Sequence, residues 1–371
     1  MRARLACIAG LSAVALLAAA CGSSGGGGST PSSGSGSSSS SAPAAAKFKA
    51  CLVSDTGTVN DKSFNQSAYT GATEASADDP DITAQFLPSA SPTDYAPNIT
   101  SFINQKCGII ITVGFLMGDA TQKAAQANPD QKFAIVDFSY AKPLGNVDAL
   151  LFNTVEDGFL GGYLAAAMSK TGKVATFGGQ KLPTVTIYMD GYWDGVQYYN
   201  QKHHKNVQVL GWNEKTQNGS FTGNFTDLGT GQRLTTTFIS EGADVIFPVA
   251  GNVGLGAAKA VQTADAAAGT QKVNMMWVDT DGCVSAAQYC KYFITSVNKG
   301  ITVAVKGAIE AAKKGDFKGG NYVGTLANNG VGLAPFHDFD GKIPASVKSE
   351  LDQIKADIIS GKIKPATKSP A

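Results

Sequence analysis

Apolar segments that end in a polar residue alternate with segments of helical periodicity along most of this 371-residue chain. In the first unit, residues 47–54 are a short apolar run, a loop of turn-forming residues follows, and residues 63–77 continue at helical spacing. Similar units recur as far as Lys314. Strands and helices that alternate at these lengths form mostly parallel sheets with right-handed crossovers. The alternation therefore predicts an α/β fold.

The units divide into two series, in residues 47–153 and 154–279. The roughly 325 residues from Lys47 onward are enough for two domains of ordinary size. We therefore expect two doubly wound parallel-sheet lobes with a ligand cleft between them.

Several chain crossings should join the two lobes. We expect the segment of about 280–318 to return to the first lobe, and part of the segment 319–371 to belong to the second. Hinges are expected near residues 153–155 and 279–281, with a third crossing after Gly315.

The N-terminal region differs from the rest of the chain. Residues 1–20 carry two arginines and then an apolar stretch with small residues before Cys21, which is typical of a signal peptide that ends in a lipobox. Ala18 stands where the usual lipobox has leucine. The apolar stretch is short for a membrane span. We therefore expect a mature chain that is lipidated at Cys21 and anchored to the extracytoplasmic face of the cell membrane.

Cys21 and the Gly- and Ser-rich residues up to 46 should form a lipidated tether, because this composition cannot bury a core. A coil of this length spans about 25–30 Å on average. Removing the two arginines of residues 1–20 from the 30 basic side chains leaves 28 against 29 acidic ones. This near-neutral balance argues against a nucleic-acid partner, which requires a basic face.

Four cysteines remain in the folded part of the chain. In an oxidising compartment we expect a local bridge between Cys283 and Cys290. Cys51 begins the first strand and Cys107 precedes the third, and these strands are neighbours in a sheet of order 2-1-3-4-5, so a second bridge can form. Alternatively, all four are small buried hydrophobes. The chain has no C-x-x-C pair and its histidines lack ligand spacing, so we expect neither a metal nor another cofactor.

Charged residues end several of the expected strands. Asp55, Asp137, Asp279 and Lys299 hold such positions. Ligands of open α/β sheets bind outside the carboxyl ends of the strands, so these side chains are candidates for a site. A strand-end aspartate is also a common helix cap, and a strand-end lysine is usually solvated.

Loop residues add to this set. Phe64 is a large ring on a polar loop at the start of a helix, where stacking on a flat ligand explains it better than core packing does. Phe221 and Phe225 lie on a long polar loop, where a ring can equally cover the core. Gly251 opens a glycine-containing turn before a helix, but the turn lacks the order of a dinucleotide or P-loop motif.

Together these features resemble a known family. The matching stretches are D-T-G-T-V-N-D-K-S-F-N-Q at 55–66, F-A-I-V-D at 133–137, F-T-D at 225–227, G-A-D-V-I-F-P-V-A-G at 242–251 and T-S-V-N-K at 295–299. With the tether, they resemble the basic membrane protein family of ABC-transporter substrate-binding lipoproteins, which includes purine nucleoside receptors. The resemblance runs from about residue 50 to 315 and implies the type I periplasmic-binding-protein fold.

The resemblance also implies the ligand contacts. Phe64 and Phe225 would sandwich the base, and Asp137 would hydrogen-bond to its edge. The long loop leaves open whether Phe221 or Phe225 stacks, although the F-T-D context favours Phe225.

The remaining contacts implied by the resemblance involve the ribose and the walls of the cleft. Asp55 and Asn65 would line the first-lobe wall, and Asp279 and Lys299 would bind the ribose hydroxyls. Gly251 would allow the backbone to approach the ligand closely.

The function implied is therefore capture of a nucleoside by a monomeric receptor, whose closed form is recognised by an ABC permease in the membrane. Two alternatives stay open. One is a receptor of the same fold for a sugar or another small solute, or a sensor that feeds a signalling protein. The other is an enzyme such as a nucleoside hydrolase, although the sequence offers no nucleophile-base pair, metal cluster or hydride-site fingerprint.

Overall fold

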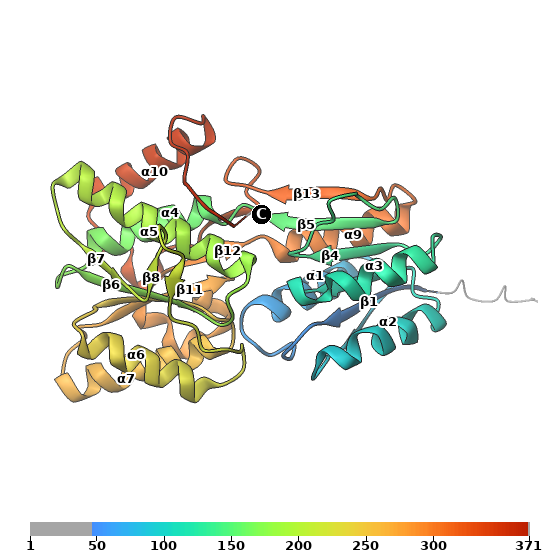
Figure 1. The fold of residues 1–371 in the computed structure, drawn as a ribbon, viewed down its shortest axis with the longest axis horizontal. Coiled ribbons are helices and arrows are strands. Elements are labelled where there is room, and N and C mark those ends of the chain that lie inside the picture. The colour runs from blue at the N-terminus through green and yellow to red at the C-terminus, as the bar shows by residue number, and fades with distance from the viewer. Residues whose placement is uncertain (1–46, 370–371) are drawn as a thin grey trace, which may run out of the picture. The chain divides into compact units, whose positions relative to one another are not determined.

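The computed structural model describes residues 47–369 (Figure 1). The signal peptide, the lipidation site at Cys21 and the tether that we expect from the sequence lie outside the described residues.

The first lobe contains a six-stranded parallel sheet in the order β13-β5-β4-β3-β1-β2 (Figure 1). Its strands are β1 (Phe48–Ser54), β2 (Ile82–Leu87), β3 (Ile109–Val113), β4 (Phe133–Val136), β5 (Val147–Phe152) and β13 (Gly320–Gly324). Its helices are α1 (Phe64–Asp78), α2 (Tyr95–Asn104), α3 (Gly118–Ala127) and α9 (Ile301–Lys314), with 3₁₀ turns η1 (Pro92–Asp94) and η2 (Phe115–Met117).

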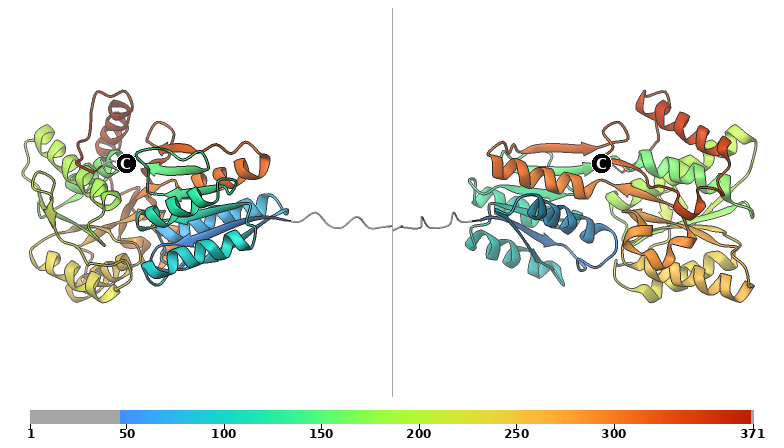
Figure 2. Two further views of the ribbon diagram at one scale, coloured as in Figure 1. Left: turned by 45° about the vertical axis from the view of Figure 1, so that its right-hand side comes forward. Right: turned by 180° about the vertical axis from the view of Figure 1, so that it is seen from behind.

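Helices cover both faces of this sheet (Figure 2). In β1, Ala50 and Leu52 belong to the apolar cluster that includes α1 and α9, whereas Cys51 and Val53 belong to the cluster that includes α2 and α3. All four residues are fully buried. A strand buried on both faces explains why this segment reads as a continuous apolar run.

The second lobe repeats this plan with the sheet order β14-β12-β11-β10-β6-β7, in which β14 is antiparallel to β12. Its strands are β6 (Lys173–Gly178), β7 (Gln208–Leu210), β10 (Val245–Val249), β11 (Asn274–Asp279), β12 (Phe293–Lys299) and β14 (Val331–Leu333). A separate hairpin contains β8 (Trp212–Asn213) and β9 (Asn218–Gly219). The helices are α4 (Val155–Met168), α5 (Pro183–His203), α6 (Leu228–Ser240), α7 (Val253–Ala268), α8 (Gly282–Ser285) and α10 (Ala345–Ile359), with η3 (Ala287–Tyr292) and η4 (His337–Phe339).

The two sheets correspond strand by strand. The order β2-β1-β3-β4-β5 of the first lobe matches β7-β6-β10-β11-β12 of the second. Both are the 2-1-3-4-5 order of a doubly wound sheet. This confirms the predicted fold class, and it makes the ends of β4 and β11 equivalent positions in the two lobes.

The chain crosses between the lobes at three places, and one differs from the expected position. The first crossing is at residues 153–155 and the third lies between β13 and β14. The second follows Lys299, because β12 pairs in parallel with β11 and thus belongs to the second sheet. The expected return to the first lobe at about residue 280 is therefore wrong, since the turn after Asp279 only leads through α8 and η3 to the neighbouring strand.

Helices α4 and α5 pack closely through glycines. A Cβ atom at Gly162 would collide with the backbone carbonyl oxygen of Tyr192, and one at Gly191 would collide with that of Val155. The small residues of α4 therefore allow the two backbones to approach each other.

Both expected cysteine pairs form disulfides. Cys51 in β1 is bonded to Cys107, the residue two positions before the neighbouring strand β3. Cys283 and Cys290 join α8 to η3 in the connection between β11 and β12.

Candidate functional site

A pocket lies where the carboxyl ends of the strands of both lobes meet. The structure brings all eight residues of the predicted ligand site to its wall. The first lobe contributes Asp55, Phe64, Asn65 and Asp137, and the second contributes Phe225, Gly251, Asp279 and Lys299. Residues more than 240 positions apart in the sequence therefore share one site, because equivalent strand ends of the two sheets face the same space.

Lys299, the last residue of β12, lies between two carboxylates. Its Nζ is 2.7 Å from Oδ2 of Asp137 in the first lobe and 3.8 Å from Oδ1 of Asp279 in the second. The side chain of Lys299 is only 3% exposed. Burial alone would lower the pKa of this lysine, but attraction by Asp137 and Asp279 outweighs burial and raises the pKa above its usual value. Lys299 therefore carries its charge in the buried pocket.

Aromatic rings surround the same ammonium group. Its Nζ lies 5.2 Å from the ring centres of both Phe64 and Tyr188 and 5.7 Å from that of Phe152. The electron-rich ring faces add to the stabilisation by the carboxylates. The ammonium group is thus held in the pocket wall, beside the Asp137 and Asp279 carboxylates that also line the pocket.

The two aspartates beside Lys299 share an unusual backbone conformation. Asp137 follows β4 and Asp279 ends β11, and each has a φ angle of +67°. Left-handed backbone costs most residues other than glycine about 1–2 kcal/mol, and aspartate tolerates it better than most. Strain at equivalent positions of both lobes indicates a constraint from the site, because such strain concentrates where ligands bind.

Asp55 and Asp61 make the first-lobe wall acidic. Burial raises the pKa of Asp55 from 3.8 to about 7, although its carboxylate accepts a hydrogen bond from the N–H of Thr56. Burial likewise raises the pKa of Asp61 to about 6. The Asp55 carboxyl therefore gains and loses its proton near neutral pH, and it can donate or accept a hydrogen bond.

Asp61 fixes the start of α1, the helix that begins at Phe64. Its carboxylate accepts hydrogen bonds from the backbone N–H groups of Ser63, Asn65 and Gln66 at 2.7–3.0 Å. These bonds satisfy N–H groups that lack a partner within the first turn of a helix. Asp61 therefore caps the start of α1 and holds Phe64 at the mouth of the pocket.

The same turn carries contacts between the lobes. The hydroxyl of Ser63 donates to the Asp279 carboxylate at 2.7 Å and to the carbonyl of Val278 at 3.1 Å. The carbonyl of Lys62 accepts from the indole N–H of Trp277 at 2.9 Å and from the hydroxyl of Ser285 at 2.8 Å. We call this set of four hydrogen bonds the Lys62–Ser63 latch.

Several residues of the pocket wall and of the Lys62–Ser63 latch had no signal in the sequence. Tyr188 lies within α5, where a tyrosine resembles a core residue, yet its hydroxyl donates to Asp279 at 3.1 Å. Ser63 and Trp277 likewise resemble an ordinary helix start and a core ring. The structure also places Phe115, the first residue of η2, in the pocket wall.

The two candidate rings of the long loop have different positions. Phe225 lines the pocket, whereas Phe221 does not and instead packs against Gly178 and Trp212, with ring centres of Phe221 and Trp212 5.9 Å apart. The β8–β9 hairpin, which no pattern in the sequence predicts, holds Trp212 in this place. Of the two rings, Phe225 is thus the one available to a ligand.

Two polar atoms of the wall have no hydrogen-bond partner among the described residues. They are Oγ1 of Thr56 and Oδ1 of Asn65, and both are buried. Burying such atoms unpaired is costly, so a polar ligand that reached them would remove that cost. In the part of the wall that the second lobe contributes, Gly251 has a φ of +52°, and a Cβ there would meet no atom within 4 Å, which leaves room for a ligand against its backbone.

Within residues 47–369, no helix combines the length and the apolar character needed to cross a bilayer.

Comparison with known proteins agrees with this arrangement. The model of the family described as PnrA-like ABC transporter substrate-binding proteins matches residues 48–369. The ABC transporter nucleoside-binding protein BmpA of Lactococcus lactis subsp. cremoris is 30% identical over 328 residues, which cover 85% of this chain and 88% of that protein. An uncharacterized lipoprotein of Pyrococcus abyssi is 30% identical over 302 residues, covering 80% of this chain and 70% of that protein.

A solved structure is similar throughout the folded part. The solute-binding protein of an ABC transporter system from Aeropyrum pernix K1 superposes with a TM-score of 0.78 at 26% identity, covering 87% of this chain and 94% of that chain. With its two doubly wound lobes and a pocket between them, the chain belongs to the family of PnrA-like ABC transporter substrate-binding proteins.

Proposed function

We propose that this protein is the nucleoside receptor of an ABC importer, with a preference for purine nucleosides. The observation that carries the proposal is the pocket itself, in which Phe64 and Phe225 from opposite lobes line the same space as Asp137, Asp279 and Lys299. Aromatic rings suit a flat base, and buried carboxylates and an ammonium suit hydroxyl and amino groups. The nucleoside-binding name of the lactococcal relative supports the same ligand class.

In the proposed complex, different residues of the pocket wall contact the base and the ribose. Phe64 and Phe225 stack on the two faces of the base. Asp279 and Lys299 bind the ribose hydroxyls. Asp137 addresses the base edge through Oδ1, because its Oδ2 accepts from Lys299.

Asp55 and Asn65 complete the proposed first-lobe wall, and Gly251 the opposite one. The unpaired Oδ1 of Asn65 accepts from a ligand donor. A site built from several hydrogen bonds to hydroxyls rejects analogues that lack those hydroxyls.

Closure of the lobes would convert binding into a transport signal. The Lys62–Ser63 latch joins the lobes beside the pocket, and the Lys299–Asp137 pair does the same within it. A ligand that bridges the lobes favours this closed form by its differential affinity, and the permease would recognise that form. The receptor acts as a monomer.

The proposal also places the protein at the extracytoplasmic face of the cell membrane, lipid-anchored at Cys21. The lipoprotein name of the Pyrococcus relative supports this. A Cys21→Ala variant expressed in a bacterium that processes lipoproteins should move from the membrane fraction to the soluble fraction. Retention of the variant in the membrane would contradict the anchor while leaving the ligand assignment untouched.

Isothermal titration calorimetry tests the ligand class. Inosine, guanosine and adenosine should bind to the purified protein more tightly than uridine, and free ribose and glucose should give no heat of binding. Tight binding of a sugar without nucleoside binding would overturn the proposal in favour of a sugar receptor. Chromatography of the mixture should recover the nucleoside intact, whereas release of free base would identify an enzyme.

A further inference from the structure

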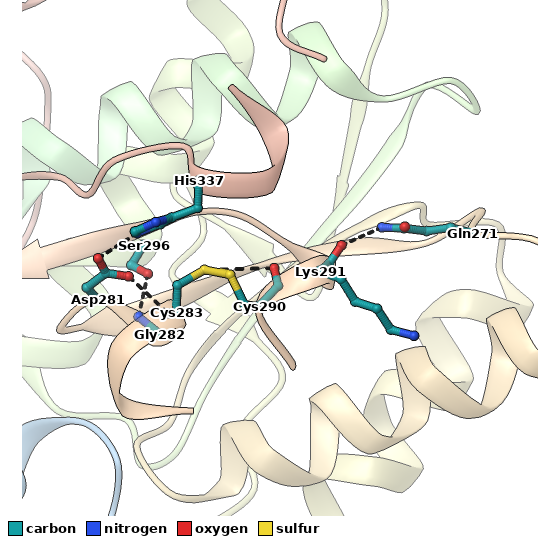
Figure 3. Close-up of a disulfide and its surroundings, with 8 residues drawn as sticks. All are labelled: Gln271, Asp281, Gly282, Cys283, Cys290, Lys291, Ser296 and His337. Carbon is teal, nitrogen blue, oxygen red and sulfur yellow. Dashed lines mark hydrogen bonds and ion pairs between the residues drawn. A yellow bond between two sulfur atoms is a disulfide. The ribbon is translucent and has the colours of Figure 1, made fainter. Parts of the chain in front are cut away.

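A second cluster of chemically active side chains lies outside the pocket, around the Cys283–Cys290 disulfide. Asp281 and Cys283 flank the start of α8, and His337 opens η4 (Figure 3). One donor atom each of Asp281, Cys283 and His337 lies within 4.8 Å of the other two. The sequence conceals this cluster, because His337 follows the cysteines at a distance that no ligand spacing predicts.

The arrangement is more constrained than a surface ion pair requires. Oδ2 of Asp281 is 2.7 Å from Nε2 of His337, and Oδ1 of Asp281 accepts from the N–H of Cys283, so both carboxylate oxygens are held (Figure 3). The side chains of His337 and Asp281 are 32% and 20% exposed, and such partly exposed pairs stabilise proteins little. His337 has a φ of +42°, in the left-handed region that few residues other than glycine adopt, although histidine adopts it more often than most.

The oxidation state of the Cys283 and Cys290 sulfurs determines whether this cluster can bind a metal ion. A disulfide sulfur is a poor metal ligand, whereas the thiolate is a strong one. Transfer of two electrons from a dithiol would break the bond between Cys283 and Cys290, giving two thiols here and a disulfide in the reductant. Zn²⁺ then replaces the two thiol protons, and these are released to water.

We propose that the reduced protein binds Zn²⁺ through Cys283, Cys290, His337 and Asp281. Two thiolates, an imidazole and a carboxylate are the donors that zinc prefers in a closed tetrahedral site. Donor atoms in such a shell lie roughly 3–4 Å apart. The donor atoms of Asp281, Cys283 and His337, already within 4.8 Å of one another, need to move by about an ångström. Cys290 is bonded to Cys283 and so lies next to these donors.

The other disulfide does not compete for a mild reductant. Cys51 and Cys107 are 0% and 4% exposed, whereas Cys283 and Cys290 are half-buried. Thiol–disulfide exchange requires access to a sulfur, so the Cys283–Cys290 bond reacts first. None of the four proposed ligands lines the nucleoside pocket, so this proposal stands whether or not nucleosides are the ligand.

Cobalt spectroscopy of the chain from Cys21 onward tests the proposal. The protein is treated with a dithiol, freed of it on an anaerobic column and titrated with Co²⁺. The reduced protein should develop a thiolate-to-cobalt charge-transfer band and the visible bands of a tetrahedral site at one Co²⁺ per chain, and Zn²⁺ should abolish both. The oxidised protein should remain colourless. Absence of these bands after reduction would overturn the proposal.

Variants assign the ligands. His337→Ala should weaken Co²⁺ binding at least tenfold, and the double variant Cys283→Ser with Cys290→Ser should abolish the bands. The matched control is His203→Ala, which removes a histidine paired with Glu350 in another part of the lobe and should bind like the wild type. The double variant Cys51→Ser with Cys107→Ser should also keep the bands. Loss of the bands in this variant would show that the metal binds Cys51 and Cys107 and would contradict the proposed site.

Stability gives a second readout that does not depend on colour. Zn²⁺ should raise the melting temperature of the reduced wild type, because a ligand that binds only the folded state stabilises it, and should leave the oxidised protein unchanged. An equal shift in the Cys283→Ser, Cys290→Ser variant would contradict the site.

Discussion

Nζ of Lys299, in the second lobe, lies 2.7 Å from Oδ2 of Asp137, in the first, and this buried ion pair joins the lobes inside the pocket. Asp279 lies on the other side of the same ammonium at 3.8 Å. Removing the cation would leave two carboxylates buried together without a countercharge. The closed arrangement of the lobes therefore depends on Lys299.

Replacing Lys299 by methionine should lower the free energy of unfolding by about 3–5 kcal/mol, as measured in urea, because one partner of a buried pair is lost. Lys306→Met is the matched control, since Lys306 pairs with Asp78 at the surface, where an ion pair is screened by water, and it should change stability far less than Lys299→Met does. In the double variant with Asp137→Asn, the loss should be smaller than the sum of the single losses. Additive losses would show that the two side chains are not coupled.

The acidic wall predicts a pH dependence of stability. The pKa of Asp55 is raised by burial from 3.8 to about 7, so between these values the folded protein binds more protons than the unfolded chain. The free energy of unfolding should therefore fall as the pH rises from about 4 to about 7 and then level off, with at most about 4 kcal/mol from this residue.

Thermal unfolding of Asp55→Asn across this pH range checks the prediction. The asparagine cannot ionise, so the variant should gain stability relative to the wild type at pH 7 and lose this advantage near pH 4. A constant difference between the two proteins at every pH would exclude Asp55 as the titrating group.

The Lys62–Ser63 latch should control how long a ligand stays bound. Ser285→Ala removes one of the two hydrogen bonds to the Lys62 carbonyl, and the net value of such a bond is about 0.5–1.5 kcal/mol. Ligand release, followed by stopped-flow fluorescence, should accelerate roughly two- to tenfold while association changes little. Ser349→Ala removes a local hydroxyl contact within α10 and should leave both rates unchanged.

The glycine contact between α4 and α5 makes a prediction about folding alone. Gly162→Ala should destabilise the protein, because the new Cβ would collide with the carbonyl oxygen of Tyr192. Gly307→Ala, in the exposed part of α9, would meet no atom within 4 Å and should stabilise the helix by up to about 1 kcal/mol. Urea unfolding that showed equal effects for the two variants would contradict the close approach of the helices.

Much of the fold follows from local patterns in the sequence. The apolar run of β1 and the helical spacing of α1 predict a doubly wound unit, because both features are set within about twenty residues. The crossing after Lys299 is different. A strand that ends in aspartate looks the same in the sequence whether the chain then leaves the lobe or stays in it. After Asp279 the chain stays in the second lobe and turns back through α8 to the neighbouring strand. Pairing across the sheet decides this, and pairing has no local signal.

Some residues of the site can likewise be predicted from local patterns in the sequence, and others cannot. Phe64 was identifiable because a large ring on a polar loop conflicts with its surroundings. Tyr188, Ser63 and Trp277 obey local rules in their own elements, and their roles arise only when α5, α1 and β11 come together. The left-handed backbone of Asp137 likewise has no counterpart in the sequence.

Binding of a purine nucleoside to the wild type and to two phenylalanine variants tests whether Phe225 stacks on the base of a bound nucleoside. Phe225 lines the pocket and Phe221 packs against Trp212, although the two rings are four positions apart on one loop. By calorimetry, Phe225→Ala should weaken binding by about 1–3 kcal/mol, as the loss of base stacking does, and Phe221→Ala should bind nearly as tightly as the wild type. Wild-type affinity in Phe225→Ala would contradict stacking by Phe225, and no nucleoside binding by the wild type would contradict the nucleoside receptor itself.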